Sequence, residues 1–221
     1  MELYYGNIAQ EYLELLKVEN IFTNYKNEFL LANTPNFYES SQEIEKILDI
    51  QKKAMESKEW ESIKKFCMQW DGDIIESFAK TLKKMNIPAN DDYLEYLADV
   101  SQDFGALIMQ LKNTFQRARP YQVAYYSNLP LHPFETHSGN TPSYPSGHAG
   151  QGYFICSVIA NHYPEKAKEL RTLAMKIAES RVIMGIHFPS DNLFGMEIAN
   201  ELMGKDDIKA KYFSDEEEAN I

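Results

Sequence analysis

The stretch "SGHAGQGYFICSVIANHYP", residues 146–164, predicts a helix whose beginning can hold a ligand. Ser146 is a good N-cap, and Pro164 marks the end of the helix. Gly147 lets the backbone come close to a ligand, and the free N–H groups of the first turn favour a phosphate-like anion. His148 lies in the same turn and can act as an acid or a base near neutral pH. On its own, the stretch fits a simple capped helix as well as an anion-binding site.

Helices are also predicted over most of the remaining chain, which shows no alternating strand pattern and no internal repeat. Ser40 and Glu43 form a capping-box pattern, and Ser190 and Gly204 bound a later helix. The one long irregular stretch, residues 121–145, has a length usual for functional or disordered loops. We therefore predict an all-α fold, a compact helical bundle with helical segments at residues 40–57, 90–119, 150–163, 164–186 and 190–204.

The size and composition of the chain indicate a single domain with its own core. It has 221 residues, of which 44% are hydrophobic. The longest nearly apolar run, residues 153–160, is far shorter than the roughly 20 residues that cross a membrane. The N-terminus shows no secretory signal, and Cys67 and Cys156 are interpreted as buried thiols in a reducing compartment. We therefore expect a cytoplasmic protein without a transmembrane segment.

The charge of the chain restricts its partners. A net charge of −11 repels nucleic acid and anionic membrane surfaces at long range, so we expect no nucleic-acid partner. Any basic site must be a local pocket. The C-terminal residues 206–221 are interpreted as an acidic tail, ending in a solvated, frayed segment.

Two cations near residue 120 are candidates for such a pocket. Six residues separate Lys112 from Arg119, so two helical turns bring both side chains to nearly the same helix face. Pro120 then ends the helix. Taken alone, the pair fits a solvated basic helix end better than a binding site, because cations suit the C-terminal end of the helix dipole.

The stretch "ESRVIMGIHFPSD", residues 179–191, adds a third cation and a second histidine. Arg181 has a planar guanidinium suited to oxyanions. Asp191 follows His187 by four residues and can accept the proton of one imidazole nitrogen, which leaves the other nitrogen free to attack. By itself, the His–Asp pair could also brace a corner of the fold.

The three stretches together carry the parts that phosphoryl transfer needs. These are three cations, an anion-binding helix start and two histidines, one with a carboxylate partner. The patterns K-x6-RP, PSGH and SR-x5-H-x3-D resemble the signature motifs of the type 2 phosphatidic acid phosphatase (PAP2) superfamily, which includes acid phosphatases, lipid phosphate phosphatases and vanadium haloperoxidases. The wider settings "SYPSGHA" and "ESRVIMGIHFPSD" are most similar to soluble bacterial class A acid phosphatases. The matching residues are Lys112, Arg119, Pro120, Pro145, Ser146, Gly147, His148, Ser180, Arg181, His187 and Asp191.

The resemblance implies a role for each site residue and a helical bundle of the PAP2 type. His187 would be the nucleophile that forms a phosphohistidine, with Asp191 orienting it, and His148 would protonate the leaving group. The phosphoryl oxygens would be held by Lys112, Arg119, Arg181, Ser146 and the Gly147 amide. The implied reaction is hydrolysis of a small phosphomonoester without a metal or other cofactor.

Two alternatives to this phosphatase remain. In haloperoxidase members, vanadate is a cofactor and bonds to the residue that matches His187, whereas it would be an inhibitor of a phosphatase. A non-catalytic oxyanion-binding protein is the other alternative, although pure binding needs neither His148 nor the pair of His187 with Asp191. Family members are often oligomeric, so a homo-oligomer is possible. The predicted domain covers residues 1–221, with N-terminal packing at 1–90, a catalytic core at 91–205 and the tail at 206–221.

A second phosphatase-like pattern is interpreted as a decoy. "WDGDII", residues 70–75, is similar to the aspartate-nucleophile motif of haloacid dehalogenase-type phosphatases, and "GKDD", residues 204–207, to their later acidic motif. Those enzymes need the first motif at the end of a strand in a parallel sheet, and the surroundings here are helical. We therefore expect a loop between helices at the first pattern and a helix end at the second.

Overall fold

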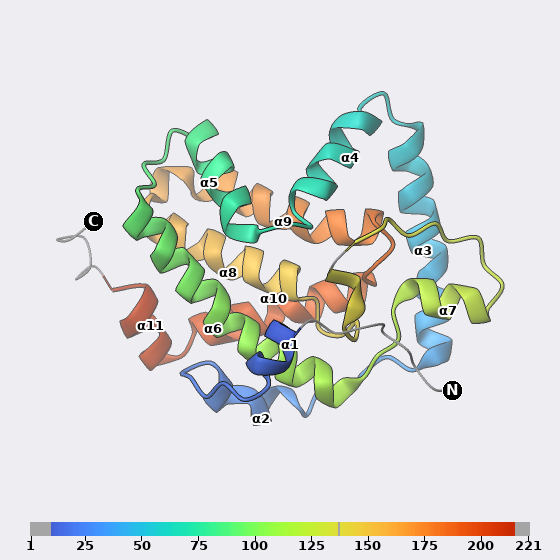
Figure 1. Ribbon diagram of the computed structural model, residues 1–221, viewed down its shortest axis with the longest axis horizontal. Helices are drawn as coiled ribbons and strands as arrows, with labels where there is room; N and C mark the ends of the chain where they lie inside the picture. Colours follow the sequence, from blue (N-terminus) through green and yellow to red (C-terminus); the bar gives the residue numbers. More distant parts are fainter. Residues whose placement is uncertain (1–9, 137, 215–221) are drawn as a thin grey trace.

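A computed structural model describes residues 10–136 and 138–214, and within these residues all regular secondary structure is helical (Figure 1). The all-α prediction is confirmed. None of the helices in these two ranges is long and apolar enough to cross a membrane. In chain order the elements are α1 (Gln10–Leu15), η1 (Thr23–Tyr25), α2 (Lys26–Phe29), α3 (Phe37–Glu56), α4 (Trp60–Gln69), α5 (Ile74–Lys84), α6 (Asp91–Phe115), α7 (Pro120–Tyr126), η2 (Ser138–Asn140), α8 (Gly147–His162), η3 (Pro164–Lys166), α9 (Ala167–Ile183), α10 (Pro189–Met203) and α11 (Asp206–Tyr212).

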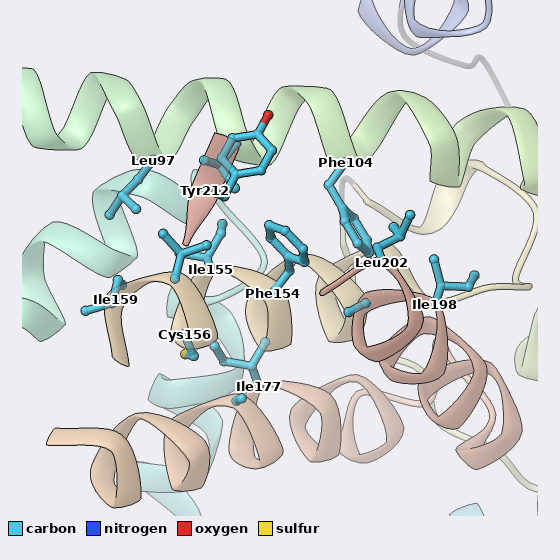
Figure 2. Packing of buried hydrophobic residues seen from close by; sticks show 14 of the residues in the cluster. Leu97, Phe104, Phe154, Ile155, Cys156, Ile159, Ile177, Ile198, Leu202 and Tyr212 are labelled. Atoms are coloured by element: carbon cyan, nitrogen blue, oxygen red, sulfur yellow. The ribbon is translucent and has the colours of Figure 1, made fainter. Parts of the chain in front are cut away.

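The main core forms around α8, the helix predicted from residues 146–164. Figure 2 shows α8 between α6 and α9, with α10 closing the side. Phe154 of α8 is fully buried, and its ring lies 5.6 Å from that of Phe104 on α6 and 5.2 Å from that of Phe22. Burying one such side chain contributes about 1.5–3 kcal/mol. This packing fixes the middle of α8 against α6 and the segment around Phe22.

A second, smaller core joins the N-terminal half of the chain to the region of the motifs. Ile44 and Ile47 of α3 pack with Val123 of α7, Val182 of α9 and Phe188, which directly precedes α10. Helix α3 is therefore fixed against the residues that follow His187. The N-terminal half thus does more than cover the core, because it reaches the segment between α9 and α10.

Several helix boundaries differ from the predicted ones, and the start of α3 is one of them. The capping box there is formed by Asn36 and Glu39, one turn earlier than the predicted pair Ser40 and Glu43. Pro35 and Asn36 start the helix earlier because the asparagine side chain caps it as well as serine would. Ser40 and Glu43 are therefore free to bond with residues outside the helix.

Helix α6 also ends earlier than predicted, at Phe115, and Gln116 follows in the left-handed conformation with φ = 50°. Arg119 consequently lies outside α6, and Pro120 begins α7. The argument that Lys112 and Arg119 share one helix face is therefore wrong, although both side chains still reach one cavity. The residues 121–145 that were expected to be irregular include most of α7 and all of η2.

The C-terminal elements bring two further differences. The N-cap of α10 is Phe188 and Ser190 lies inside the helix, because Pro189 occupies its first turn. Gly204 ends α10 as predicted. Residues 206–212, assigned to the acidic tail, form α11 with a buried Ile208, while residues 215–221 lie outside the described part of the chain. Cys67 and Cys156 are buried free thiols, and burial raises the pKa of the Cys67 thiol to about 11.

Candidate active site

A cavity of about 210 Å³ lies beside the start of α8 and collects side chains from distant parts of the chain. Its polar wall carries both predicted histidines and two of the predicted cations. Its apolar wall comes from α1, α5 and α6. The lining residues are Tyr12, Leu15, Asp71, Gly72, Ile74, Gly105, Ile108, Met109, Lys112, Arg119, Ser138, Thr141, Gly147, His148, Gln151 and His187.

His187 and Asp191 form the predicted pair. Nδ1 of His187 lies 3.1 Å from Oδ2 of Asp191, and Nε2 lies 2.8 Å from Nη1 of Arg119. A guanidinium can only donate, so Nε2 is the acceptor and Nδ1 carries the proton that Asp191 accepts. The geometry therefore sets one tautomer of His187, with the lone pair on the nitrogen that shares the cavity with Arg119.

Asp191 is fully buried, and both of its oxygens are engaged. Besides the imidazole, Oδ2 accepts hydrogen bonds from the Ser143 hydroxyl at 2.5 Å and from the Phe188 amide at 2.8 Å. Oδ1 accepts a hydrogen bond from Nη1 of Arg117 at 2.5 Å. This set of donors holds the carboxylate in one orientation. The Nδ1 proton of His187 therefore points toward Oδ2 of Asp191.

Arg119 is fixed chiefly by backbone carbonyls. Its Nε donates to the carbonyl of Thr141 at 2.7 Å, Nη1 to that of Ile186 at 2.7 Å and Nη2 to that of Ser138 at 3.0 Å. Carbonyls satisfy the donors without neutralising the charge. The guanidinium therefore stays positive beside Nε2 of His187.

Lys112 points toward the same wall from the last turn of α6. Its ammonium donates to the carbonyls of Pro142 and Ser143, in the segment that leads into the PSGH turn. Burial and the nearby charge of Arg119 lower the pKa of Lys112 well below its ordinary value. An anion in the cavity would favour the charged form of this side chain.

The PSGH turn starts α8 as predicted. The side chain of Ser146 accepts a hydrogen bond from the Ala149 amide, and the Ser146 amide donates to the carbonyl of Asp191 at 3.0 Å. Gly147 and His148 follow in the first turn and line the cavity. The imidazole of His148 makes no hydrogen bond with any residue in the described ranges, and it is half-buried in the cavity wall. Its nitrogens are therefore open to a ligand.

Arg181 is placed differently from the other two cations. It is fully buried on α9 and is not among the residues that line the cavity. Nη2 donates to Oδ1 of Asp71 and to Oγ of Ser138, both at 2.7 Å, and Nη1 donates to the Trp70 carbonyl at 3.2 Å. Its Nε has no hydrogen-bond partner within the described residues. Arg181 thus contributes charge to the site and also fixes the loop between α4 and α5.

Asp71 belongs to the site, although the pattern that contains it was interpreted as a decoy. It lines the cavity, pairs with Arg181 and accepts hydrogen bonds from the hydroxyls of Thr136 and Ser138 at 2.6 and 2.7 Å. Burial opposes the ionised carboxylate, but Arg181 and these hydrogen bonds outweigh burial and lower the pKa of Asp71. The "WDGDII" stretch is a loop between helices as expected, and its first aspartate nonetheless faces the candidate site.

Both histidines of the site are held in the neutral form. Burial, followed by Arg119 and Lys112, lowers the pKa of His187 well below 6.5. For His148, burial and the charge of Arg181 lower the pKa, while Asp71 opposes the shift. A neutral His187 has the free lone pair that a nucleophile needs. A neutral His148 must gain a proton before it can act as an acid.

The structure brings most of the predicted site residues to one cavity. Lys112, Arg119, Gly147, His148 and His187 line it directly. The other three predicted residues, Asp191, Ser146 and Arg181, lie behind the wall and hold lining residues in place. Among residues 10–136 and 138–214, no group of three or more His, Cys, Asp or Glu lies together as a metal site requires.

The cavity has the composition of a site that binds an oxyanion. It carries cations, a histidine paired with a carboxylate and a second, open histidine. Residues 100–200 match the profile of the PAP2 superfamily, and this segment contains all three motifs. This segment therefore resembles the PAP2 superfamily, as the motifs predicted.

Characterised relatives match over a shorter length. A non-specific acid phosphatase of Salmonella typhimurium is 35% identical over 80 residues, which are 36% of this chain and 32% of the relative. A lipid A 1-phosphatase of Rhizobium johnstonii is 32% identical over 92 residues, 42% of this chain and 37% of the relative. The crystal structure of a transmembrane PAP2-type phosphatidylglycerolphosphate phosphatase from Bacillus subtilis aligns with a TM-score of 0.38 and 21% identity, covering 92% of this chain and 95% of that one. The chain spans only about a third of the length of the Salmonella typhimurium and Rhizobium johnstonii phosphatases.

Proposed function

We propose that this protein is a phosphatase that hydrolyses phosphomonoesters through a phosphohistidine on His187, without a metal ion. One observation carries the proposal. Nε2 of His187 holds a lone pair 2.8 Å from the Arg119 guanidinium, while Nδ1 is tied to Asp191 at 3.1 Å. A nucleophile whose tautomer is set by a carboxylate and whose attacking nitrogen lies beside a fixed cation suits attack on phosphorus.

Substrate binding follows from the charges around the cavity. Lys112 and Arg119 line it, and Arg181 lies behind it, so a phosphoryl group with two negative charges meets three cations. The amides at the start of α8, a helix of 16 residues, add the positive end of a dipole. On binding, Arg119 would exchange its hydrogen bond to Nε2 for one to a phosphoryl oxygen and release the lone pair for attack.

In the first chemical step, Nε2 of His187 forms a bond to phosphorus while the bond from phosphorus to the ester oxygen breaks. The imidazole becomes positively charged, and Asp191 stabilises this charge through Nδ1. His148 gives its proton to the departing oxygen, so an alcohol leaves. The negative phosphoryl group raises the pKa of His148 when it binds, because an opposite charge nearby favours the protonated imidazole.

In the second step, a water molecule attacks the phosphorus of phosphohistidine. His148, now neutral, accepts a proton from this water, and the bond between phosphorus and Nε2 breaks. Inorganic phosphate leaves, and His187 returns to its neutral form. His148 thus serves as acid and then as base, which its open imidazole in the cavity wall permits.

The cavity suits a small substrate. Its volume of about 210 Å³ is below the roughly 300–1,000 Å³ of pockets that enclose drug-sized ligands. Tyr12, Leu15 and Ile108 add an apolar wall opposite the cations. We propose that the substrates are small phosphomonoesters whose leaving group lies against this wall.

The test is hydrolysis of p-nitrophenyl phosphate by the purified protein with a chelator present, run beside bromide oxidation with vanadate and peroxide. Release of nitrophenol and a rapidly quenched, acid-labile and base-stable phosphoryl group that is absent in His187→Ala would support the proposal. Phosphate trapped on a carboxylate or hydroxyl would contradict the mechanism. Bromide oxidation without phosphate release would contradict the function.

A further inference from the structure

Arg117 is a buried arginine outside the three motifs, and it links the N-terminal half of the chain to the candidate nucleophile. Its side chain is 2% exposed, and the Cζ atom of its planar guanidinium lies 3.9 Å from the centroid of the Phe188 ring. Nη1 donates to Oδ1 of Asp191 at 2.5 Å and to the hydroxyl of Ser190 at 2.7 Å. Nη1 of this guanidinium thus donates hydrogen bonds to residues at the start of α10.

The other two nitrogens of the guanidinium, Nε and Nη2, donate hydrogen bonds to side chains of α3. Nη2 donates to Oε1 of Glu43 at 2.9 Å and to the Ser40 hydroxyl at 3.0 Å, and Nε donates to the same hydroxyl at 3.2 Å. Glu43 also accepts hydrogen bonds from the amide and hydroxyl of Ser190, at 2.9 and 2.6 Å. The carboxylate of Glu43 therefore ties α3 to α10 directly as well as through Arg117.

The contacts form an ordered series of charges. Glu43 is negative, Arg117 positive and Asp191 negative, and His187 becomes positive when its Nε2 attacks. Each charge pairs with the next at hydrogen-bond distance, namely 2.9, 2.5 and 3.1 Å. A carboxylate as buried as Asp191 needs such a partner, because an unpaired buried charge costs several kcal/mol.

We propose that Arg117 and Glu43 are positioning residues for the nucleophile, in an inference that rests on the phosphatase proposed above. Arg117 pairs with Oδ1 of Asp191 and holds the carboxylate so that Oδ2 faces Nδ1 of His187. Glu43 balances the positive charge of Arg117. The negative charge of Asp191 is therefore not fully neutralised by Arg117 and can stabilise the imidazolium that forms when His187 attacks. Helix α3 thereby supports the chemistry from outside the segment that matches the family.

The kinetic effect should fall on the chemical step. Neither Arg117 nor Glu43 lines the cavity, whereas Lys112 and Arg119 do. Substitutions that disturb the series should therefore lower kcat and leave substrate binding intact. Outer partners of this kind are worth about 10–100-fold in metal sites, where they orient a histidine in the same way.

The first experiment compares Glu43→Gln and Arg117→Lys with the wild-type protein on an alkyl phosphate. Glu43→Gln keeps the shape and removes the charge, and we expect a loss of kcat of about 10-fold. Arg117→Lys keeps the positive charge and removes the planar set of guanidinium donors, and we expect a loss of kcat of about 10–100-fold. KM and the inhibition constant of vanadate should change less than about twofold. Asp103→Asn is the matched control, because Asp103 pairs with Lys211 at 3.1 Å and does not line the cavity, and the kcat of this variant should not change.

The second experiment reads the position of His187 without catalysis. In ¹⁵N NMR of the ligand-free protein, His187, assigned through His187→Ala, should show a protonated Nδ1 in the wild type and a mixture of tautomers in Arg117→Lys. Should Arg117→Lys not fold, Glu43→Gln decides the question. Folded variants with wild-type kcat and the wild-type tautomer would overturn the inference. A wild-type protein without phosphatase activity would contradict the proposed function instead, and the NMR comparison would still report on positioning.

Discussion

Gly195 on α10 touches the backbone of the PSGH turn, and one added methyl group there is expected to disturb stability and activity together. A Cβ at this position would lie 2.4 Å from the carbonyl oxygen of Ser146 and 3.3 Å from the amide nitrogen of Gly150. Both obstacles are backbone atoms, so no side chain can rotate away. Gly195→Ala must therefore push α10 away from the start of α8.

The size of the effect follows from this contact. An ordinary contact of this kind begins near 3.4 Å, so the two helices must separate by about 1 Å. Overpacking of this kind costs about 1–3 kcal/mol, and the stretched hydrogen bond from the Ser146 amide to the Asp191 carbonyl loses about 1 kcal/mol more. A loss of about 2–4 kcal/mol lowers the Tm of a chain of this size by roughly 4–16 °C. Asp191 moves with α10, and a displacement of about 1 Å at a catalytic group lowers kcat by roughly 100-fold.

The assay is thermal unfolding followed by circular dichroism, with kcat measured well below the Tm. Gly72→Ala is the control for stability, since nothing lies within 4 Å of a Cβ there and the substitution should keep or slightly raise the Tm. A Gly195→Ala protein as stable as the wild type would refute the packing argument. A destabilised protein with wild-type kcat would refute the coupling of the α8–α10 spacing to His187.

Four further outcomes are expected. His148→Ala should slow an alkyl phosphate by roughly 10²–10⁴-fold and p-nitrophenyl phosphate much less, because only the alkoxide needs a proton, so an equal loss on both substrates would argue against an acid role. Since burial and Arg181 hold the pKa of His148 below 6.5 and its proton is required, kcat/KM should fall as the pH rises above that lowered pKa. Asp71→Asn removes the carboxylate that raises the pKa of His148, so this falling limb should move to lower pH in a pH–rate profile, and an unmoved limb would contradict the assignment. Vanadate should compete with the substrate and chelators should have no effect in steady-state assays, whereas strict dependence on Mg²⁺ would point to a different mechanism.

The sequence was sufficient for the helical fold and for five of the residues that line the cavity, because these depend on local patterns. The N-cap at Ser146 and the spacing of His187 and Asp191 act within one or two turns of the chain. The end of α6 could not be predicted from Pro120 alone, since Gln116 adopts a left-handed conformation that ends the helix earlier. The residues around Gln116 contain no sequence pattern that predicts a left-handed conformation at this position.

The residues that sequence reasoning missed are those whose role depends on distant partners. Asp71 had a signal, an aspartate directly after a buried tryptophan, but only the fold shows that it faces Arg181. Glu43 was interpreted as half of a capping box, because the spacing from Ser40 is correct for one. Ser40 and Glu43 instead bond with Arg117, which is 74 positions beyond Glu43. No local pattern contains a contact over that distance.

The site is held together by contacts that are long in sequence, and this has a consequence for the order in which the protein folds. Ser190 bonds with Glu43 across 147 positions and Arg181 with Asp71 across 110, whereas α8 and α9 are adjacent in the chain. Closing a longer loop loses more chain entropy before any contact compensates for it, so contacts between neighbouring helices form earlier than those that complete the site. A fragment of residues 100–200 would keep all three motifs and lose the partners of Arg117 and Arg181 on α3 and in the loop after α4. The segment that carries the family's signature is therefore smaller than the unit that must fold to make the site.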